Sequence, residues 1–420
     1  MSRMEEKQAK LVELYLTNSA QHPLKIFLHE HARYAWSDDE DIDDTMGITG
    51  FNVFCSVIAE LHRCREFHYA VSSGGLLGEV GRERVVWGFN VPEARWFWNL
   101  VKNSPNLINL AVNGLKDNWR YPRSLQILKI SYQENYSSLF EVLSYLPNLK
   151  TLHLHTIYSR ESPVFRLAEP LSIGLRDVTI TTPGQLERLT LLFDSLILPT
   201  LSSLTILTCQ QFSFPDEVPT TNQSDSDVTS YRDNQLTALH ALVQRSACTL
   251  RELTLYVEPF SSADILSILE LQPSLTGLEL EIRVPRTQTP SLSSVLVDLC
   301  ARMSHPGSPL LPNLRRLSIH ETLYVDYREY DINDALCHAA CVVDMLESRE
   351  LGRSGEAPRV TEVMLKFGRV VPLGYATTVQ SEYKIPVDLV RRVQALEEKR
   401  IRCHITLPIM VEGESFRDEE

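Results

Sequence analysis

The sequence of 420 residues has no stretch near the roughly 18–20 consecutive apolar residues of a membrane-spanning helix. Its first ten residues, MSRMEEKQAK, are charged and lack the apolar segment of a secretion signal. The longest basic stretches are Arg391-Arg392 and Lys399-Arg400, and the formal net charge is −13. Because non-specific nucleic-acid binding needs a basic surface, we expect neither nucleic acid nor a membrane as a partner.

Familiar catalytic motifs are also missing. The sequence has no Gly-x-Ser-x-Gly elbow. The Gly-rich stretch at 72–81 lacks the Gly-Lys-Ser/Thr ending of a phosphate-binding loop. The acidic run at 38–44 lacks the glycine and the final glutamate of a calcium loop. We therefore predict no catalytic and no cofactor-binding residue. An enzyme on an α/β scaffold stays open, because active sites assemble from residues far apart in sequence.

The eight cysteines follow no pairing rhythm, which indicates reduced thiols in an intracellular protein, cytoplasmic or nuclear. Cys337 and Cys341 lie one helical turn apart, but zinc would need two further ligands and none stands nearby. His29 and His31 would share one face of a strand. We predict no metal site, and we interpret the cysteine pair as small residues in a helix core.

A repeat is the main feature that the sequence does contain. LPNLKTLHLH at 146–155 returns as LPNLRRLSIH at 311–320. The shared core, Leu-x-x-Leu-x-Leu/Ile with Val allowed, occurs nine times, and four of the eight gaps between copies measure 24–26 residues. The copies begin at Leu107, Leu125, Leu149, Leu175, Leu201, Leu250, Leu275, Leu314 and Val360.

The end of each copy alternates apolar and polar residues, which predicts a strand with one buried face. Segments at 137–146, 183–196, 262–271 and 386–400 have helical periodicity. In the first we expect Leu139, Val142, Leu143 and Leu146 to be buried, and in the third Ile265, Leu266, Ile268 and Leu269. Strand, helix, strand at this spacing predicts parallel strands joined by crossovers that stack on their neighbours. A doubly wound sheet with accidental leucine spacing remains the alternative.

The pattern resembles leucine-rich repeats over residues 106–367. The resemblance implies an α/β solenoid, a curved parallel sheet with helices on its outer face. At the ninth repeat position the family carries Asn or Cys, which here occurs only as Cys209, so the turns must be satisfied differently. We divide the chain into an irregular α/β N-terminal cap (1–101), a repeat region (102–370) with a disordered insertion near 212–234, a C-terminal capping helix and strand (371–410), and an acidic tail (411–420).

The stretch LVELYLTNSAQHPLKIFLHEH at 11–31 resembles the segment that follows the F-box in many fungal F-box proteins, where leucine-rich repeats come next. In that family the F-box docks the adaptor of a cullin–RING ubiquitin ligase, and the repeats hold the substrate. Only ten residues precede Leu11, and they show no F-box pattern. We therefore expect the substrate-side half of such a subunit, with an F-box lost or encoded upstream, and adaptor binding only if an upstream F-box exists.

The strand face offers a surface, because residues between the buried ones point outward. We expect it to bind a protein without catalysis, as a substrate receptor of a ubiquitin ligase. A stand-alone leucine-rich-repeat scaffold is the second hypothesis, and the enzyme is the third. The outward residues best suited to recognition are His153, His155, Asp177, Glu252, Tyr256, Glu279, Glu281, Arg316 and His320.

Overall fold

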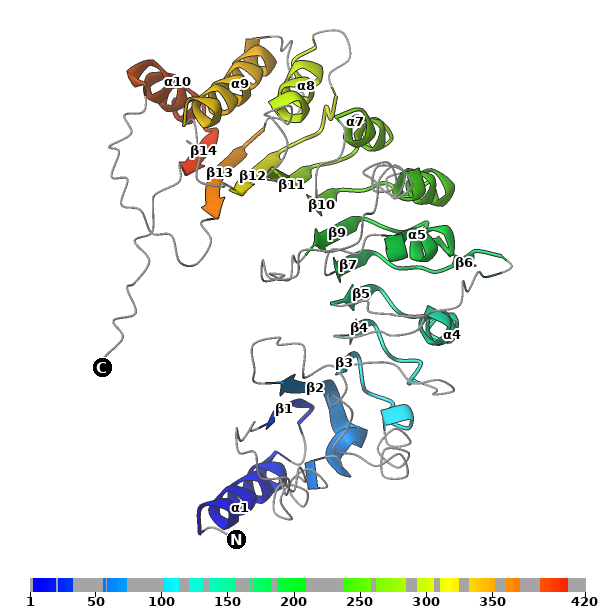
Figure 1. The fold of residues 1–420 in the computed structure, drawn as a ribbon. Coiled ribbons are helices and arrows are strands. Elements are labelled where there is room, and N and C mark those ends of the chain that lie inside the picture. Colours follow the sequence, from blue (N-terminus) through cyan, green and yellow to red (C-terminus); the bar gives the residue numbers. More distant parts are fainter. Residues whose placement is uncertain are drawn as a thin grey trace, which may run out of the picture. The chain divides into compact units, whose positions relative to one another are not determined.

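A computed structural model gives the fold (Figure 1). It divides into two compact units, Met1–Ile180 and Thr181–Glu420. The predicted loops at 38–44 and 212–234, most of the Gly-rich stretch, and the acidic tail lie outside the described residues. The residues that the structure describes are 3–19, 22–32, 56–57, 59–73, 101–112, 121–130, 136–155, 167, 169–182, 187–208, 237–257, 262–284, 293–305, 310–324, 332–351, 360–370 and 386–406.

The first unit is built on parallel strands that pair in chain order. The strands are β1 (Leu24–Ala32), β2 (Cys64–Ser73), β3 (Asn109–Val112), β4 (Ile127–Ile130), β5 (Thr151–Leu154) and β7 (Asp177–Thr182), whose last two residues belong to the second unit. The remaining elements are helix α1 (Arg3–Asn18), the 3-10 turn η1 (Glu60–Arg63), helix α4 (Tyr136–Ser144) and the short β6 (Leu171–Ser172).

The second unit repeats the plan, again with parallel strands paired in chain order. In Figure 1, α7 to α10 line one side of β10 to β14. The strands of this sheet are β9 (Ser203–Thr208), β10 (Glu252–Val257), β11 (Gly277–Val284), β12 (Arg316–Tyr324), β13 (Glu362–Val370) and β14 (Arg402–Thr406). The short β8 (Leu196–Ile197) is not part of it. The helices are α5 (Glu187–Asp194), residues 237–246, α7 (Ser262–Glu270), α8 (Ser293–Met303), α9 (Ile332–Leu351) and α10 (Val387–Glu398).

The predicted α/β class with parallel strands is therefore confirmed. Within each unit the strand order never reverses, whereas a doubly wound sheet has a reversal point. The helices predicted at 137–146, 183–196, 262–271 and 386–400 correspond to α4, α5, α7 and α10. One detail was wrong: Leu266 of α7 is half-exposed rather than buried. Its position in α7 lies beside the buried stripe of Ile265, Ile268 and Leu269 rather than in it.

The core is made of the repeated apolar residues. The first, fourth and sixth residues of all nine copies are buried, and none is more than 5% exposed. In the copy that begins at Leu149 these are Leu149, Leu152 and Leu154, each 1% exposed. The first residue of a strand and the residue before it add a backbone link: the N–H groups of Lys150 and Thr151 both donate to the Gln126 carbonyl, at 2.8 and 3.0 Å. The same link recurs from Arg315 and Arg316 to Thr276, at 2.8 and 2.9 Å, so each repeat is held in register with the one before it.

A polar side chain before the first leucine satisfies the turn between repeats. In the two matching decamers, Asn148 Nδ2 donates to the Arg123 carbonyl at 2.9 Å, and Asn313 Nδ2 donates to the Pro273 carbonyl at 3.0 Å. At the corresponding position of two other copies, the side chain also donates to a carbonyl of the preceding repeat: Ser124 to Leu107 and Ser274 to Leu250. Ahead of the first copy, Asn106 donates in the same way to His62 of η1. These bonds supply a repeat-to-repeat side-chain link in place of the Asn or Cys that leucine-rich repeats carry at the ninth position.

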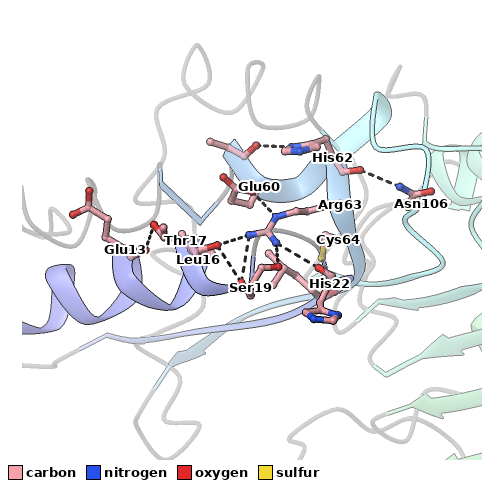
Figure 2. Close-up of polar contacts among 12 residues, drawn as sticks. Glu13, Leu16, Thr17, Ser19, His22, Glu60, His62, Arg63, Cys64 and Asn106 are labelled. Carbon is pink, nitrogen blue, oxygen red and sulfur yellow. Dashed lines mark hydrogen bonds and ion pairs between the residues drawn. The ribbon is translucent and has the colours of Figure 1, made fainter.

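Helix α1 is fastened to the first unit by one arginine (Figure 2). Arg63, at the end of η1, donates from Nη2 to the Leu16 carbonyl at 2.8 Å and from Nη1 to the carbonyls of Ser19 and His22. Its Nε donates to Glu60 Oε2 at 2.6 Å, which orients the guanidinium. A cation at the carboxyl end of a helix satisfies open carbonyls and favours the helix dipole. Arg63 thus holds the turn between α1 and β1.

Replacing Arg63 by glutamine should therefore loosen α1. We expect amide hydrogen exchange in the last two turns of α1 to accelerate by roughly tenfold or more, because hydrogen bonds from a charged donor are lost. Hydrogen exchange followed by mass spectrometry measures this. Arg65→Gln, an exposed neighbour, is the control and should leave α1 unchanged. Equal protection of α1 in Arg63→Gln and the wild type would contradict the role given to Arg63.

Removing the asparagine side-chain amide that bonds to the preceding repeat should weaken the stacking of repeats. Asn148→Ala and Asn313→Ala are each expected to lower the free energy of unfolding by about 1 kcal/mol, the usual net value of such a hydrogen bond. Urea unfolding gives the measurement. Asn103→Ala removes an exposed asparagine and should stay within about 0.5 kcal/mol of the wild type. If all three variants unfold at the same urea concentration, the amide bonds contribute nothing.

Candidate protein-binding surface

The strand face of the second unit is organised in rows that run across the strands. Residues that pair in register lie side by side, and every second residue of a strand points to the same face. In the row nearest the strand starts, Glu252, Gly277, Arg316, Glu362 and Arg402 are neighbours on consecutive strands. This row therefore alternates negative and positive charge, with one glycine in it.

Gly277 allows an ion pair to form across a whole strand. Arg316 Nη2 donates to Glu252 Oε1 at 2.6 Å, although β11 lies between their strands. The Glu252 carboxylate lies directly over Gly277, so that a Cβ added there would overlap it. Farther along the row, Arg402 pairs with Glu362 at 3.4 Å. The charges of this row are thus largely matched within the unit.

The next two rows carry Glu279, Glu281 and His320. Glu279 Oε1 lies 3.7 Å from His320 Nε2, and the Ser318 hydroxyl lies 3.1 Å from the same nitrogen. Burial lowers the pKa of His320, and Lys366 lowers it further, while Glu279 and Glu281 act in the opposite direction. The net result is a lowered pKa, so the folded chain favours the neutral imidazole of His320.

In the first unit, His153 of β5 lies between Lys129 of β4 and Thr179 of β7. Burial lowers the pKa of His153, Lys129 lowers it further, and Asp177 opposes both. Asp177 Oδ2 accepts a hydrogen bond from Thr151 Oγ1 at 3.3 Å. His155 follows the end of β5 and is exposed.

The structure thus brings together three groups of the predicted residues: Glu252 with Arg316, Glu279 and Glu281 with His320, and His153 with Asp177. Tyr256 lies in β10 opposite Glu281, but its side chain lies outside the described residues. Sequence reasoning missed Gly277. The repeat alignment already held the signal, because Gly277 is the third residue of its copy, as Glu252 and Arg316 are of theirs.

The metal-binding candidates of the sequence are the pair Cys337 and Cys341 and the pair His29 and His31. Within the described residues, no three His, Cys, Asp or Glu side chains are placed to share a metal ion. Cys337 is exposed rather than buried, because it lies on the outer side of α9. Cys341 is half-buried and forms a hydrogen bond with Cys300 of α8, whose thiol pKa is raised by burial. His29 and His31 lie in β1, and their side chains are outside the described part.

Comparison with known proteins does not place the chain in a family. No protein-family model matches it, and no curated protein gives a significant match. The resemblances to leucine-rich repeats and to F-box proteins therefore remain predictions. None of the helices in the described ranges is long and apolar enough to cross a lipid bilayer.

The lowered pKa of His320 has a consequence for stability. Below about pH 6.5, the usual pKa of histidine, the unfolded chain takes up a proton that the folded chain resists. The free energy of unfolding should therefore fall as the pH drops from 7 to 5. His320→Gln should lose less stability over this interval than the wild type, as measured by urea unfolding at both pH values.

Lys366→Gln gives a second test of the lowered pKa of His320. It removes a charge that lowers the pKa of His320, so its pH dependence should also be shallower than that of the wild type. If both variants lose as much stability as the wild type, protonation of His320 does not limit folding in acid.

Proposed function

We propose that this chain is a non-catalytic recognition protein whose strand faces bind a protein partner. The observation that carries the proposal is the arrangement of charged side chains in rows across neighbouring strands. Glu252, Arg316 and Glu279 are held by partners on other strands, so the surface presents a fixed pattern of charge. Fixed polar groups with aromatic and arginine side chains are what protein interfaces use for specificity.

The architecture supports a leucine-rich-repeat solenoid as the scaffold. Parallel strands in chain order, three buried apolar residues per repeat and side chains that bridge successive turns are what such an array requires. Residues 1–101 would then cap one end, and 371–410 the other. Six strands at about 4.8 Å spacing give each unit a face about 24 Å wide between its outer strands. A standard interface uses roughly 800 Å² per partner.

Within this proposal, the F-box resemblance of residues 11–31 makes the partner a substrate for ubiquitination. The link to a ligase adaptor would come from an F-box encoded upstream. In the alternative version, the chain is a stand-alone scaffold without a role in ubiquitin transfer, and it binds its partner through the same surface. Mapping the 5′ end of the native transcript and the N-terminal peptide of the native protein separates these two versions.

Charge reversal tests the surface itself. The double variant Glu279→Lys, Glu281→Lys changes the centre of the strand face of the second unit. Glu397→Lys, Glu398→Lys makes the same change in net charge at the exposed end of α10. Proteins that co-purify with the tagged chain from its native cells are quantified by mass spectrometry for the wild type and both variants.

We expect at least one co-purifying protein to fall by roughly tenfold or more with the strand-face variant and to be retained by the helix variant. Circular dichroism and urea unfolding must show that both variants fold. If the helix variant loses the same proteins, or the strand-face variant loses none, the acidic centre of this face is not the binding site.

A further inference from the structure

One row on the strand face of the first unit differs in chemistry from the acidic centre of the second unit, which is formed by Glu279 and Glu281. Register places its members on six consecutive strands. The Phe27 ring stacks on His68 with centroids 4.5 Å apart and is itself 65% exposed. In order, the row reads Phe27, His68, Ala111, Lys129, His153 and Thr179. It contains an aromatic ring, two imidazoles and an ammonium group, and no acidic residue.

Lys129 is the centre of positive charge in this row. Its side chain is half-buried, and its charge lowers the pKa of His68 and of His153. No hydrogen bond or ion pair joins Lys129 to any other residue in the described ranges. In the adjacent row, by contrast, Lys25 pairs with Glu66 at 2.7 Å. A partly desolvated ammonium without an ion pair is unfavourable, and a bound anion would relieve it.

The residue next to Lys129 in the row is small. Ala111, between His68 and Lys129, has a side chain of one carbon. Asp177, the nearby carboxylate, accepts a hydrogen bond from Thr151 and lies opposite Thr151, diagonally from His153. The Lys25–Glu66 pair is neutral as a unit. Lys129 therefore supplies a positive charge that no ion pair in the described ranges offsets, and Asp177 is the carboxylate that competes with a bound anion.

We propose that Lys129, with His153 on the next strand and His68 two strands away on the other side, binds a carboxylate or phosphate group on an acidic segment of the protein partner. The proposal rests on the function proposed above and names the chemistry of the partner. The half-buried ammonium supplies the charge, and the imidazole N–H groups are the neighbouring donors; in His68 this N–H is at Nδ1, because Nε2 accepts from Asn109 Nδ2 at 3.4 Å. The exposed Phe27 ring extends the site with an aromatic surface at the β1 edge.

Binding should strengthen as the pH falls from 7 to 6. A bound anion offsets the repulsion by Lys129 and raises the pKa of both histidines, so protons are taken up on binding. The charged groups that face His68 and His153 are Lys129, Lys25, Glu66 and Asp177. The two lysines oppose protonation of the histidines, and the two carboxylates favour it. A bound anion acts in the same direction as the carboxylates.

The experiment uses the full chain and fluorescently labelled hexaglutamate, with hexaglutamine as the uncharged control and a phosphoserine hexapeptide as the second anion. Fluorescence anisotropy at low ionic strength gives the affinities. Lys129→Gln should weaken binding of an anionic peptide by roughly tenfold or more, and Lys129→Arg should retain most of it. Asp177→Asn should tighten binding, because it removes a competing negative charge.

Lys150→Gln is the matched control. Lys150 is an exposed lysine in the same unit, and its Nζ donates to Gln126 Oε1 at 3.1 Å, so its removal should change the affinity less than about twofold. Preference for hexaglutamate identifies a carboxylate, and preference for the phosphoserine peptide identifies a phosphate; either supports the site if it depends on Lys129.

Three results would overturn the proposal: neither anionic peptide binds, Lys129→Gln binds as well as the wild type, or Lys150→Gln loses as much as Lys129→Gln. If the peptides fail while reversal at Glu279 and Glu281 still removes a partner, only the anion site is wrong. If Lys129-dependent binding is found and the reversal has no effect, the anion site stands and the acidic centre of the second unit is wrong.

Discussion

Burial of three apolar side chains per repeat is the interaction on which the structure depends. The strands β3, β4 and β5 have only four residues each, too few to be stable alone. Each fully buried leucine contributes about 1.5–3 kcal/mol by leaving water, but only when the next repeat covers it. In the copy that begins at Leu149, Leu149, Leu152 and Leu154 are all covered in this way. Stability is therefore shared between neighbours, and no repeat has a core of its own.

The same burial fixes what the strand faces present. A shift of register by one residue would turn the leucines outward, so the buried residues hold each strand in place. The outward residues then fall into rows, and side chains on different strands become partners. Glu252 reaches Arg316 only because Gly277 stands between them in register. The register between β4 and β5 likewise places Lys129 beside His153. The proposed recognition surface is thus a consequence of the core.

Much of this could be predicted from the sequence, because the repeat encodes it directly. The alternation of Leu152, His153 and Leu154 gives both the strand and its buried face, and the helix at 386–400 follows from its periodicity. The contacts between side chains of distant residues could not be predicted. Arg63 bonds to Leu16, 47 residues away, and Cys300 contacts Cys341. Such contacts depend on how loops of unequal length bring elements together. No local sequence pattern indicates which distant residues will meet.

In the proposed recognition protein, the strand face rather than the helices meets the partner. The most direct measurement is site-specific photo-crosslinking in native cells, with a benzophenone amino acid at Met364 on β13 or at Gln394 on α10. Met364 lies half-exposed on the strand face, and Gln394 is exposed on a helix. We predict a discrete protein adduct from position 364 and none from position 394. An adduct from position 394 with none from position 364 would contradict it.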